Sequence, residues 1–410
     1  MFCTLNRRSI LAVIMASALA GPALAEPVTI EVASWKGNAA EPAGMAELIA
    51  KFEAENPGIK VNLVYVSRND TDTVVSPQVR GDNPPDVIMT DPPLLRQWGD
   101  AGLLAELDKG TWFDRIPENL RVAVAIDDKA YVLPLEVIGI GNFVNMALLR
   151  KVGIDTPPTT IDALKTACGK LADAGINPLI MAPGYPSSVL MMGLGLQLDP
   201  KPPAEIGRGE RTFADTPAYT KALQTIRDLE AARCFNGAEQ AGVDAWSTGL
   251  AEFSAGNFAM MPQGAWNITA FSAVEGLDFV FAPLPGMREP GVALDLFGFG
   301  WAIAAKSAHP EESKAFVNFF NNDENLNILL RAEAAYSPFT GGLNGTPPLA
   351  AAYEAARNGG GLILQPVALL EWPLSVELEI NSGMAGFLAD PSMAPAALLQ
   401  RLDEMVQDSL

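Results

Sequence analysis

Residues 28–65 read VTIEVASWKGNAAEPAGMAELIAKFEAENPGIKVNLVY and determine the beginning of the fold. Apolar residues at every second position of 28–32 predict a strand. Apolar residues at helical spacing from Met45 to Phe52 predict a helix, which Pro57 and Gly58 end. Alternation returns in residues 59–65 and predicts a second strand.

The next apolar segment, residues 86–90, lies between two proline pairs and predicts a third strand. The resulting β-α-β-α-β order predicts an α/β fold with a mainly parallel sheet and helices on both faces. Ligands of such sheets bind outside the carboxyl ends of the strands. We therefore expect ligand contacts in the loop from Trp35 to Asn38 and at Thr90 and Asp91.

Later segments continue the α/β pattern. The chain contains no low-complexity linker, which favours two lobes that the chain crosses more than once. Short strands are expected at 279–281 and 298–304. Helices are expected at 161–174, 217–234, 311–320, 371–384 and 394–406.

The first 25 residues have the features of a secretory leader. Arg7 and Arg8 precede an apolar run from Ile10 to Leu19, which is too short to remain in a bilayer as a spanning helix. Small residues at Ala23 and Ala25 predict cleavage before Glu26. Residues 6–11 loosely resemble a twin-arginine signal, although ordinary Sec export is the commoner route. We expect a soluble periplasmic protein.

The charge of the chain excludes some partners. It carries 28 Lys+Arg and 48 Asp+Glu, and removal of a leader with two arginines and no acidic residue gives a net charge of −22. Such a chain repels nucleic-acid phosphates and anionic lipid headgroups, so we expect neither nucleic-acid binding nor stable membrane insertion.

Cysteine and histidine usage argues against several chemistries. Cys168 and Cys234 remain after processing, and either a disulfide or two packed thiols is consistent with the sequence. There is no Cys-x-x-Cys and no G-x-x-x-x-G-K-[ST] loop. The single histidine, His309, leaves no basis for a histidine-rich zinc site, and no G-x-S-x-G elbow accompanies it. We expect no metal site, catalytic residue or cofactor.

Several segments together resemble the family 1 extracellular solute-binding proteins of ABC importers, the group that includes maltose-binding protein. They are ELIAKFEAENPGIKV (47–61), NPPDVIMTDPPLLRQWGDAGLL (83–104), YVLPLEVIGIGNFV (131–144), EFSAGNFAMMPQGAW (252–266) and FGFGWAIAAKSAHPEESKAFVNFF (297–320).

The resemblance implies a type II periplasmic-binding-protein fold, with two α/β lobes, a hinge and a ligand cleft between them. It implies capture of a carbohydrate and delivery to membrane ABC permease subunits by a monomer that is not an enzyme. The expected divisions are the leader (1–25), two segments of the first lobe (26–136 and 287–344) and two segments of the second lobe (137–286 and 345–410).

Positions carried over from the family give a candidate ligand site drawn from both lobes. Trp266 and Trp372 match stacking aromatics of the family, and Phe299 lies in its glycine-rich strand. The full set is Trp35, Lys36, Asn38, Thr90, Asp91, Glu136, Ile138, Tyr185, Trp266, Phe299, Trp301 and Trp372.

These residue types suit a sugar. A flat indole covers the C–H face of a pyranose and still donates a hydrogen bond at its edge. Carboxylates such as Asp91 and Glu136 accept bonds from neighbouring hydroxyls, so a neutral mono- or disaccharide is our first choice of ligand.

Each of these residues also has a simpler structural role. Asp91 precedes a predicted helix and is placed to cap it. Glu136 lies in an apolar stretch and needs a partner, which a ligand hydroxyl or a hinge amide would supply. Either Trp301 or its neighbours face the cleft, because strand residues alternate. Lys36 is more often a solvated loop lysine than a partner for an anionic ligand.

Two other functions are compatible with the sequence. A periplasmic glycoside hydrolase needs only two carboxylates beside the scissile bond. A solute receptor that docks on a sensor kinase would have the same fold. Sustained sugar release would identify the hydrolase, and neighbouring genes for permease subunits and an ATPase would identify the importer.

Overall fold

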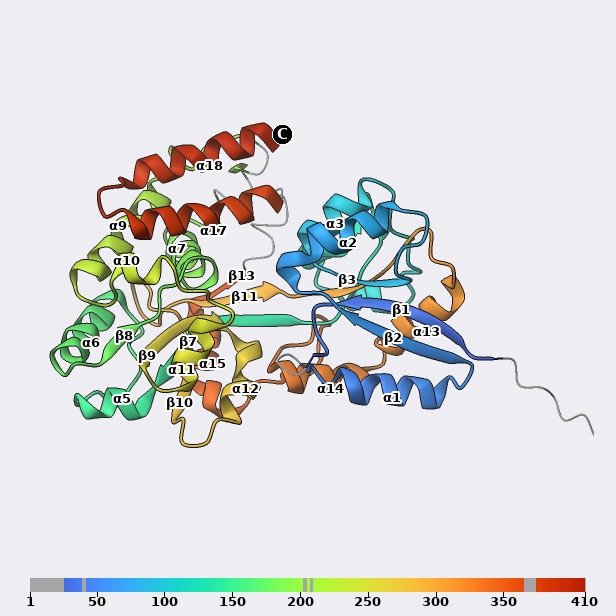
Figure 1. The fold of residues 1–410 in the computed structure, drawn as a ribbon, viewed down its shortest axis with the longest axis horizontal. Helices are drawn as coiled ribbons and strands as arrows, with labels where there is room; N and C mark the ends of the chain where they lie inside the picture. The colour runs from blue at the N-terminus through green and yellow to red at the C-terminus, as the bar shows by residue number, and fades with distance from the viewer. Residues whose placement is uncertain (1–25, 39–41, 202–204, 207–208, 365–373, 410) are drawn as a thin grey trace, which may run out of the picture.

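The computed structural model describes residues 26–38, 42–201, 205–206, 209–364 and 374–409. The predicted leader and the predicted site residue Trp372 lie outside the described residues. The described chain forms two large sheets covered by helices, with connections that run between them, and a separate two-stranded ribbon (Figure 1). No helix in these ranges is long and apolar enough to cross a membrane.

The first lobe is built on a five-stranded sheet of order β2-β1-β3-β12-β6. Parallel pairs join β1 to β2 and β3, as the β-α-β-α-β order predicts, whereas β12 runs antiparallel to β3 and β6. The strands are β1 (Val28–Ser34), β2 (Ile59–Tyr65), β3 (Val87–Thr90), β6 (Leu133–Pro134) and β12 (Gly300–Ile303).

Helices cover both faces of this sheet, with α2 and α3 on one side and α1 and α14 on the other (Figure 1). A short separate ribbon, β4 (Ala125–Ile126) and β5 (Lys129–Ala130), also belongs to the lobe. The helices are α1 (Met45–Glu55), η1 (Arg68–Asp70), α2 (Thr71–Arg80), α3 (Pro92–Gly99), α4 (Trp112–Arg115), η2 (Glu118–Ala123), α13 (Pro310–Phe319) and α14 (Asp323–Glu333).

The second lobe is built on a six-stranded mixed sheet around β7, with the order β13-β11-β7-β9-β8 and β10 also paired to β7. β7 runs antiparallel to β9, β10 and β11, whereas β8–β9 and β11–β13 are parallel. The strands are β7 (Val137–Asn145), β8 (Asn177–Leu179), β9 (Phe258–Gly264), β10 (Phe279–Ala282), β11 (Ala293–Phe297) and β13 (Leu362–Leu364).

The four helices that the sequence predicts in the second lobe, at 161–174, 217–234, 371–384 and 394–406, correspond to α6, α9, α17 and α18. The helices are α5 (Met146–Lys151), α6 (Ile161–Asp173), α7 (Tyr185–Leu198), α9 (Pro217–Ala231), α10 (Gly237–Gln240), α11 (Thr248–Ser254), η3 (Ala265–Asn267), α12 (Ile268–Ser272), η4 (Pro348–Ala350), α15 (Ala351–Ala356), η5 (Arg357–Gly361), α17 (Leu374–Ala389) and α18 (Pro395–Ser409).

Three backbone segments connect the lobes side by side. The chain leaves the first sheet through Leu135 and Glu136 and returns through Gly298 and Phe299. These two crossings are bonded to each other, because the Leu135 amide donates to the Phe299 carbonyl and the Gly298 amide donates to the Glu136 carbonyl. In the third crossing, Tyr336 exchanges two backbone hydrogen bonds with Val137. The predicted first-lobe segment 287–344 thus includes β11, which pairs in the second sheet.

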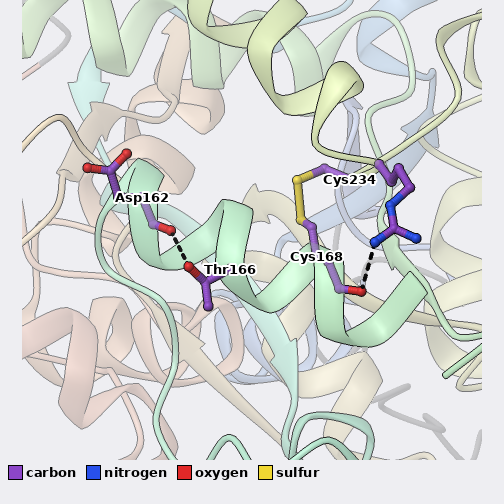
Figure 2. The surroundings of a disulfide bond; sticks show 6 residues. Asp162, Thr166, Cys168 and Cys234 are labelled. Atoms are coloured by element: carbon purple, nitrogen blue, oxygen red, sulfur yellow. Dashed lines mark hydrogen bonds between the residues drawn. A yellow bond between two sulfur atoms is a disulfide. The ribbon is translucent and has the colours of Figure 1, made fainter. Parts of the chain in front are cut away.

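A disulfide fastens two helical regions of the second lobe. Cys168 lies in α6 and Cys234 follows α9, and their sulfur atoms are bonded (Figure 2). Of the two arrangements that the sequence allowed, the structure has the bridge.

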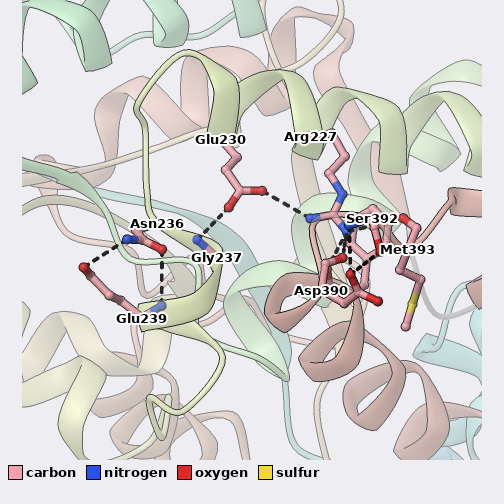
Figure 3. Close-up of polar contacts among 9 residues, drawn as sticks. Arg227, Glu230, Asn236, Gly237, Glu239, Asp390, Ser392 and Met393 are labelled. Atoms are coloured by element: carbon pink, nitrogen blue, oxygen red, sulfur yellow. Dashed lines mark hydrogen bonds and ion pairs between the residues drawn. The ribbon is translucent and has the colours of Figure 1, made fainter.

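The closing helices are held on this lobe by Arg227 of α9. Its guanidinium donates to the carbonyls of Phe387, Asp390 and Met393, which lie at the end of α17 and in the turn before α18 (Figure 3). The same group lies over the ring of Phe387, so it covers apolar surface while it satisfies the end of the helix.

Candidate functional site

The loop after β1 places Trp35 and Lys36 at the carboxyl end of the first sheet, as the strand order predicts. The Ser34 hydroxyl accepts a hydrogen bond from the Lys36 amide and donates one to the Lys36 carbonyl. Gly37 follows with a φ of 103°, a conformation that favours glycine. This tight turn directs the chain away from the sheet while Trp35 and Lys36 stay buried.

Lys36 is the charged centre of the site rather than a solvated loop lysine. Its Nζ lies 2.8 Å from Oε2 of Glu333, at the end of α14, and both side chains are almost fully buried. The same nitrogen lies 5.6 Å from the ring centre of Trp266 and 6.0 Å from that of Phe299. A single ammonium from the first lobe therefore contacts the crossing segment and the second lobe.

Glu136 is a second buried carboxylate, and it lies on the first crossing between the lobes. Only 1% of the residue is exposed, and within the described structure its Oε2 has no hydrogen-bond partner. A Cβ at Gly298 would lie 2.3 Å from its Oε1, so the glycine provides the room for this carboxyl. Burial raises the pKa of Glu136 well above its usual value, Glu333 raises this pKa further, and Lys36 opposes the shift.

Trp266 lies in an aromatic group of the second lobe. Its indole lies over Gly264, where a Cβ would approach the ring to 2.3 Å. The ring centre of Trp266 is 5.4 Å from that of Tyr185, at the start of α7, and 6.0 Å from that of Trp246. Trp266 is half-buried, and its Nε1 has no hydrogen-bond partner among the described residues.

Trp35 and Asp91 lie on the first-lobe side. The rings of Trp35 and Phe299 pack edge to face, with 6.0 Å between their centres. The guanidinium of Arg68 lies over the Trp35 ring, 5.7 Å from the ring centre. Asp91 pairs with Arg68 at 2.6 Å and also accepts a hydrogen bond from the Leu94 amide, which caps α3. Asp91 thus has the capping role and, in addition, holds Arg68 against Trp35.

The remaining predicted residues divide between the loop and the core. Asn38 is half-buried in the loop after Lys36. Thr90 is fully buried at the end of β3, and its hydroxyl donates to the Ile88 carbonyl. Ile138 is fully buried in β7.

Trp301, which the sequence analysis placed in the ligand site, lies in the hydrophobic core and is not part of the site. It is fully buried against Phe316 and Phe320, and α13 contains the first of these two residues. These ring contacts place Trp301 on the side of β12 that packs against the α13 region rather than at the lobe junction.

Three residues at the site were not predicted. Glu333 is the last residue of α14. In the sequence it cannot be distinguished from an acidic residue on the exposed face of a helix. Arg68 lies in a polar turn and gives no signal of its own. Trp246 could have been found by its type, since large aromatics often mark binding surfaces.

The site therefore joins side chains from both lobes around the crossings. Trp35, Lys36 and Glu333 come from the first lobe, Glu136 and Phe299 from the crossings, and Tyr185, Trp246 and Trp266 from the second. Within the described ranges, no three His, Cys, Asp or Glu side chains gather to hold a metal ion.

A curated protein shares part of this sequence. YcjN of Escherichia coli (strain K12), named as a periplasmic-binding protein of an ABC transporter, is 28% identical over 198 residues. That match covers 46% of this chain and 45% of YcjN.

Solved structures share the fold. A chitin oligosaccharide binding protein has a TM-score of 0.79 at 19% identity, over 93% of this chain and 98% of its own. The GacH receptor of Streptomyces glaucescens GLA.O, solved unliganded and with acarbose, has a TM-score of 0.74 at 20% identity, over 93% and 99% of the two chains. At these identities the likeness concerns the fold alone.

The sequence pattern of a family described as bacterial extracellular solute-binding protein matches residues 36–326, which is more than half of the chain. This chain belongs to the bacterial extracellular solute-binding protein family.

Proposed function

We propose that this protein binds a carbohydrate between its two lobes and delivers it to the permease subunits of an ABC importer. The observation that carries the proposal is the contact of Lys36 with Trp266 and Phe299, 5.6 Å and 6.0 Å from the two ring centres. It brings an aromatic face of the second lobe, a crossing segment and a charged group of the first lobe to one place.

The chemistry of this group fits a sugar. The Trp266 indole offers a flat face for a pyranose and an Nε1 donor with no partner among the described residues. Glu136 offers a buried acceptor, Oε2, that also lacks a partner there. A hydroxyl-bearing ring would satisfy both atoms, and a buried polar group without a partner is costly.

The names of the structural relatives support the same class of ligand. One is a chitin oligosaccharide binding protein, and GacH was solved with acarbose. These proteins share the fold with this chain. Trp301 is not part of the proposed ligand site. The proposed ligand-site residues are Trp35, Lys36, Asn38, Thr90, Asp91, Glu136, Ile138, Tyr185, Trp266, Phe299 and Trp372.

The proposed mechanism is hinge closure. A sugar first binds one lobe, and contacts from the other lobe form only when the lobes close. The sugar then stabilises the closed state by its greater affinity for that state. The paired crossings at Leu135–Phe299 and Glu136–Gly298 are the proposed hinge, because they connect the two sheets through only a few residues.

The proposed setting is the periplasm, where the protein acts as a soluble monomer after cleavage of the leader behind Ala25. The permease would recognise the relative placement of the two lobes. In this proposal the protein is a carrier and does not transform the sugar. Incubation with oligosaccharides tests this point, since sustained release of shorter sugars would indicate a glycoside hydrolase instead.

A thermal-shift screen over neutral sugars, polyols and sugar phosphates tests the proposed ligand class, followed by titration calorimetry of the ligands that raise the midpoint. We expect at least one carbohydrate to raise the unfolding temperature and to bind with one-to-one stoichiometry. If only non-carbohydrate solutes stabilise the protein, the proposed ligand class is wrong.

A further inference from the structure

A cluster of buried polar side chains in the second lobe lies beside the crossings between the lobes. Its centre is Asp295 of β11, which is fully buried. The Arg357 Nε donates to Asp295 Oδ2 at 2.8 Å, and the Tyr353 hydroxyl lies 2.9 Å from Asp295 Oδ1. The Arg357 guanidinium lies over the Tyr336 ring, 4.1 Å from the ring centre, and the Tyr336 hydroxyl donates to the Glu354 carboxylate. We call these five residues the Asp295 cluster.

The second sheet has room for this cluster at two glycines of β7. A Cβ at Gly139 would lie 2.8 Å from the Tyr353 ring, and one at Gly141 would lie 3.0 Å from it. Asp295 is the residue of β11 that pairs with Gly139. A buried carboxylate is costly unless it is paired and hydrogen-bonded, and Arg357 and Tyr353 meet both needs. A network satisfied in this way holds its members rigidly.

The cluster reaches all three crossings on their second-lobe side. The first crossing enters β7 at Val137, and the second leaves β11 at Phe297, which pairs with Val137. The third crossing contains Tyr336, a member of the cluster, whose amide and carbonyl are bonded to Val137. Asp295 lies in β11 just before Phe297. The second-lobe ends of the crossings are therefore fastened to one another by side chains as well as by the backbone.

The same crossings are fastened less firmly between the cluster and the first sheet. The first two are joined there by a hydrogen bond of 2.9 Å from the Leu135 amide and one of 3.2 Å from the Gly298 amide. The third continues there as Ala335 and Ala334, whose backbone bonds in the described chain run to α14 and Gly345 and not to the other two crossings. Ala334 has a φ of 54°, a left-handed conformation that residues with a Cβ seldom adopt.

We propose that the Asp295 cluster makes the second-lobe ends of all three crossings one rigid body with the second lobe, so that lobe closure bends the chain between the cluster and the first sheet. The bending segments are then 135–136, 298–299 and 334–335. This inference rests on the proposed hinge closure and adds to it the third crossing and the side on which the crossings bend. Glu136 lies in one bending segment and Glu333 directly precedes another, so closure changes the surroundings of both buried carboxylates of the site.

Hydrogen exchange of the sugar-free protein, read at single amides by mass spectrometry with electron-transfer fragmentation, tests the proposal. An amide whose hydrogen bond breaks during bending loses protection. We expect the Val137 and Tyr336 amides to be as protected as those of residues 142–144, which lie between β9 and β10. The Leu135 and Gly298 amides should be at least about tenfold less protected. Equal protection of all four amides, or weaker protection of Val137 and Tyr336, would overturn the proposal.

Asp295→Asn assigns the rigidity to the cluster. The substitution keeps the size of the side chain and removes the charge that pairs with Arg357. Protection of the Val137 and Tyr336 amides should fall at least about tenfold relative to that of residues 142–144. An equal fall at residues 142–144 would mean that Asp295 only stabilises the lobe, and the proposed role in the hinge would be wrong.

Tyr336→Phe is a milder second variant, because it removes only the hydroxyl that donates to Glu354. It should lower protection of the residue 336 amide about threefold or more, again relative to the centre of β7. Unchanged protection in both variants would overturn the role of the cluster. Asp278→Asn is the matched control, since Asp278 also pairs with an arginine, Arg150, but on the exposed surface of the same lobe. It should change none of these amides.

The outcomes separate this inference from the proposed function. The exchange experiments use no sugar, so their failure overturns the role of the Asp295 cluster and leaves carbohydrate binding and closure standing. If X-ray scattering shows that the lobes do not close around a bound sugar, the hinge itself is wrong and this inference falls with it.

Discussion

The ammonium nitrogen of Lys36, in one lobe, lies 5.6 Å from the ring centre of Trp266, in the other. The pair lies beside the strands that connect the lobes, and Glu333 holds the ammonium in place at 2.8 Å. The indole face that we propose for a sugar is therefore next to a buried ion pair. We therefore expect stability to depend on the Lys36–Glu333 pair and ligand affinity on Trp266, so that substitutions can separate the two effects.

Trp266→Ala removes the central stacking face. We expect carbohydrate affinity to fall by at least about 30-fold, the range of an interface residue that contributes about 2 kcal/mol or more. The half-buried position of Trp266 should leave the fold intact. Calorimetry gives the affinity, and circular dichroism during urea unfolding checks the fold. Unchanged affinity in a folded variant would show that Trp266 serves packing only.

Lys36→Met should destabilise the protein, because it leaves the buried Glu333 carboxylate without the ammonium 2.8 Å away. Removing one partner of a buried pair costs about 3–5 kcal/mol in free energy of unfolding. Adding Glu333→Gln should recover part of the loss, since the stranded charge is then gone. Urea unfolding of both single variants and the double variant measures the coupling. Strict additivity of the two single effects would contradict this pairing.

Glu136 should make stability depend on pH. Burial and the nearby Glu333 carboxylate raise the pKa of Glu136 above its ordinary value of 4.5. The folded protein then keeps a proton that the unfolded chain has released, so the free energy of unfolding falls as the pH rises from 4.5 toward the raised pKa.

Glu136→Gln imitates the protonated carboxyl and should remove this part of the pH dependence. Wild type and variant should have similar stability in acid, with the variant gaining on wild type as the pH rises. Glu275→Gln is the control, because Glu275 is exposed. Parallel pH profiles for wild type and Glu136→Gln would show that Glu136 keeps an ordinary pKa.

The disulfide between Cys168 and Cys234 closes a loop with a sequence separation of 66. Replacing both cysteines by alanine should lower the free energy of unfolding by about 4 kcal/mol, because the unlinked chain gains entropy when it unfolds. Urea unfolding of oxidised wild type against the double variant measures this loss. Sugar affinity should not change, since the bridge joins α6 to the segment after α9 and neither helix carries a site residue. Equal stability of the two proteins would contradict the bridge.

Much of the fold could be predicted because its signals are local. The alternating strands at 28–32 and 59–65, and the helix between them, give the parallel start of the first sheet. The rule for carboxyl ends indicated the loop with Trp35 and Lys36, which does follow β1 at that end of the sheet, whereas Lys36 was expected in solvent and is buried. Glu136 was recognised as a carboxyl that needs a partner, because it lies in an apolar stretch of the sequence.

The rest depends on tertiary contacts that one sequence does not display. Glu333 contributes to the site only because α14 ends beside Lys36. Nothing in the sequence around Glu333 indicates this contact. Residues two apart share one face of a continuous strand, so the local pattern gives Phe299 and Trp301 the same role. In the structure Phe299 lies before β12 and contacts Trp35, whereas Trp301 lies within β12 and packs on Phe316. The antiparallel pairs around β7 likewise follow from long-range returns of the chain rather than from any local signal.

Small-angle X-ray scattering tests the central claim, that a carbohydrate is held by both lobes at once. The radius of gyration should be measured for wild type without sugar and with a saturating amount of the sugar that calorimetry identifies. The account predicts a smaller radius with sugar, and no such change for Trp266→Ala at the same sugar concentration. An unchanged radius at proven saturation of the wild type would contradict closure of the lobes around the ligand.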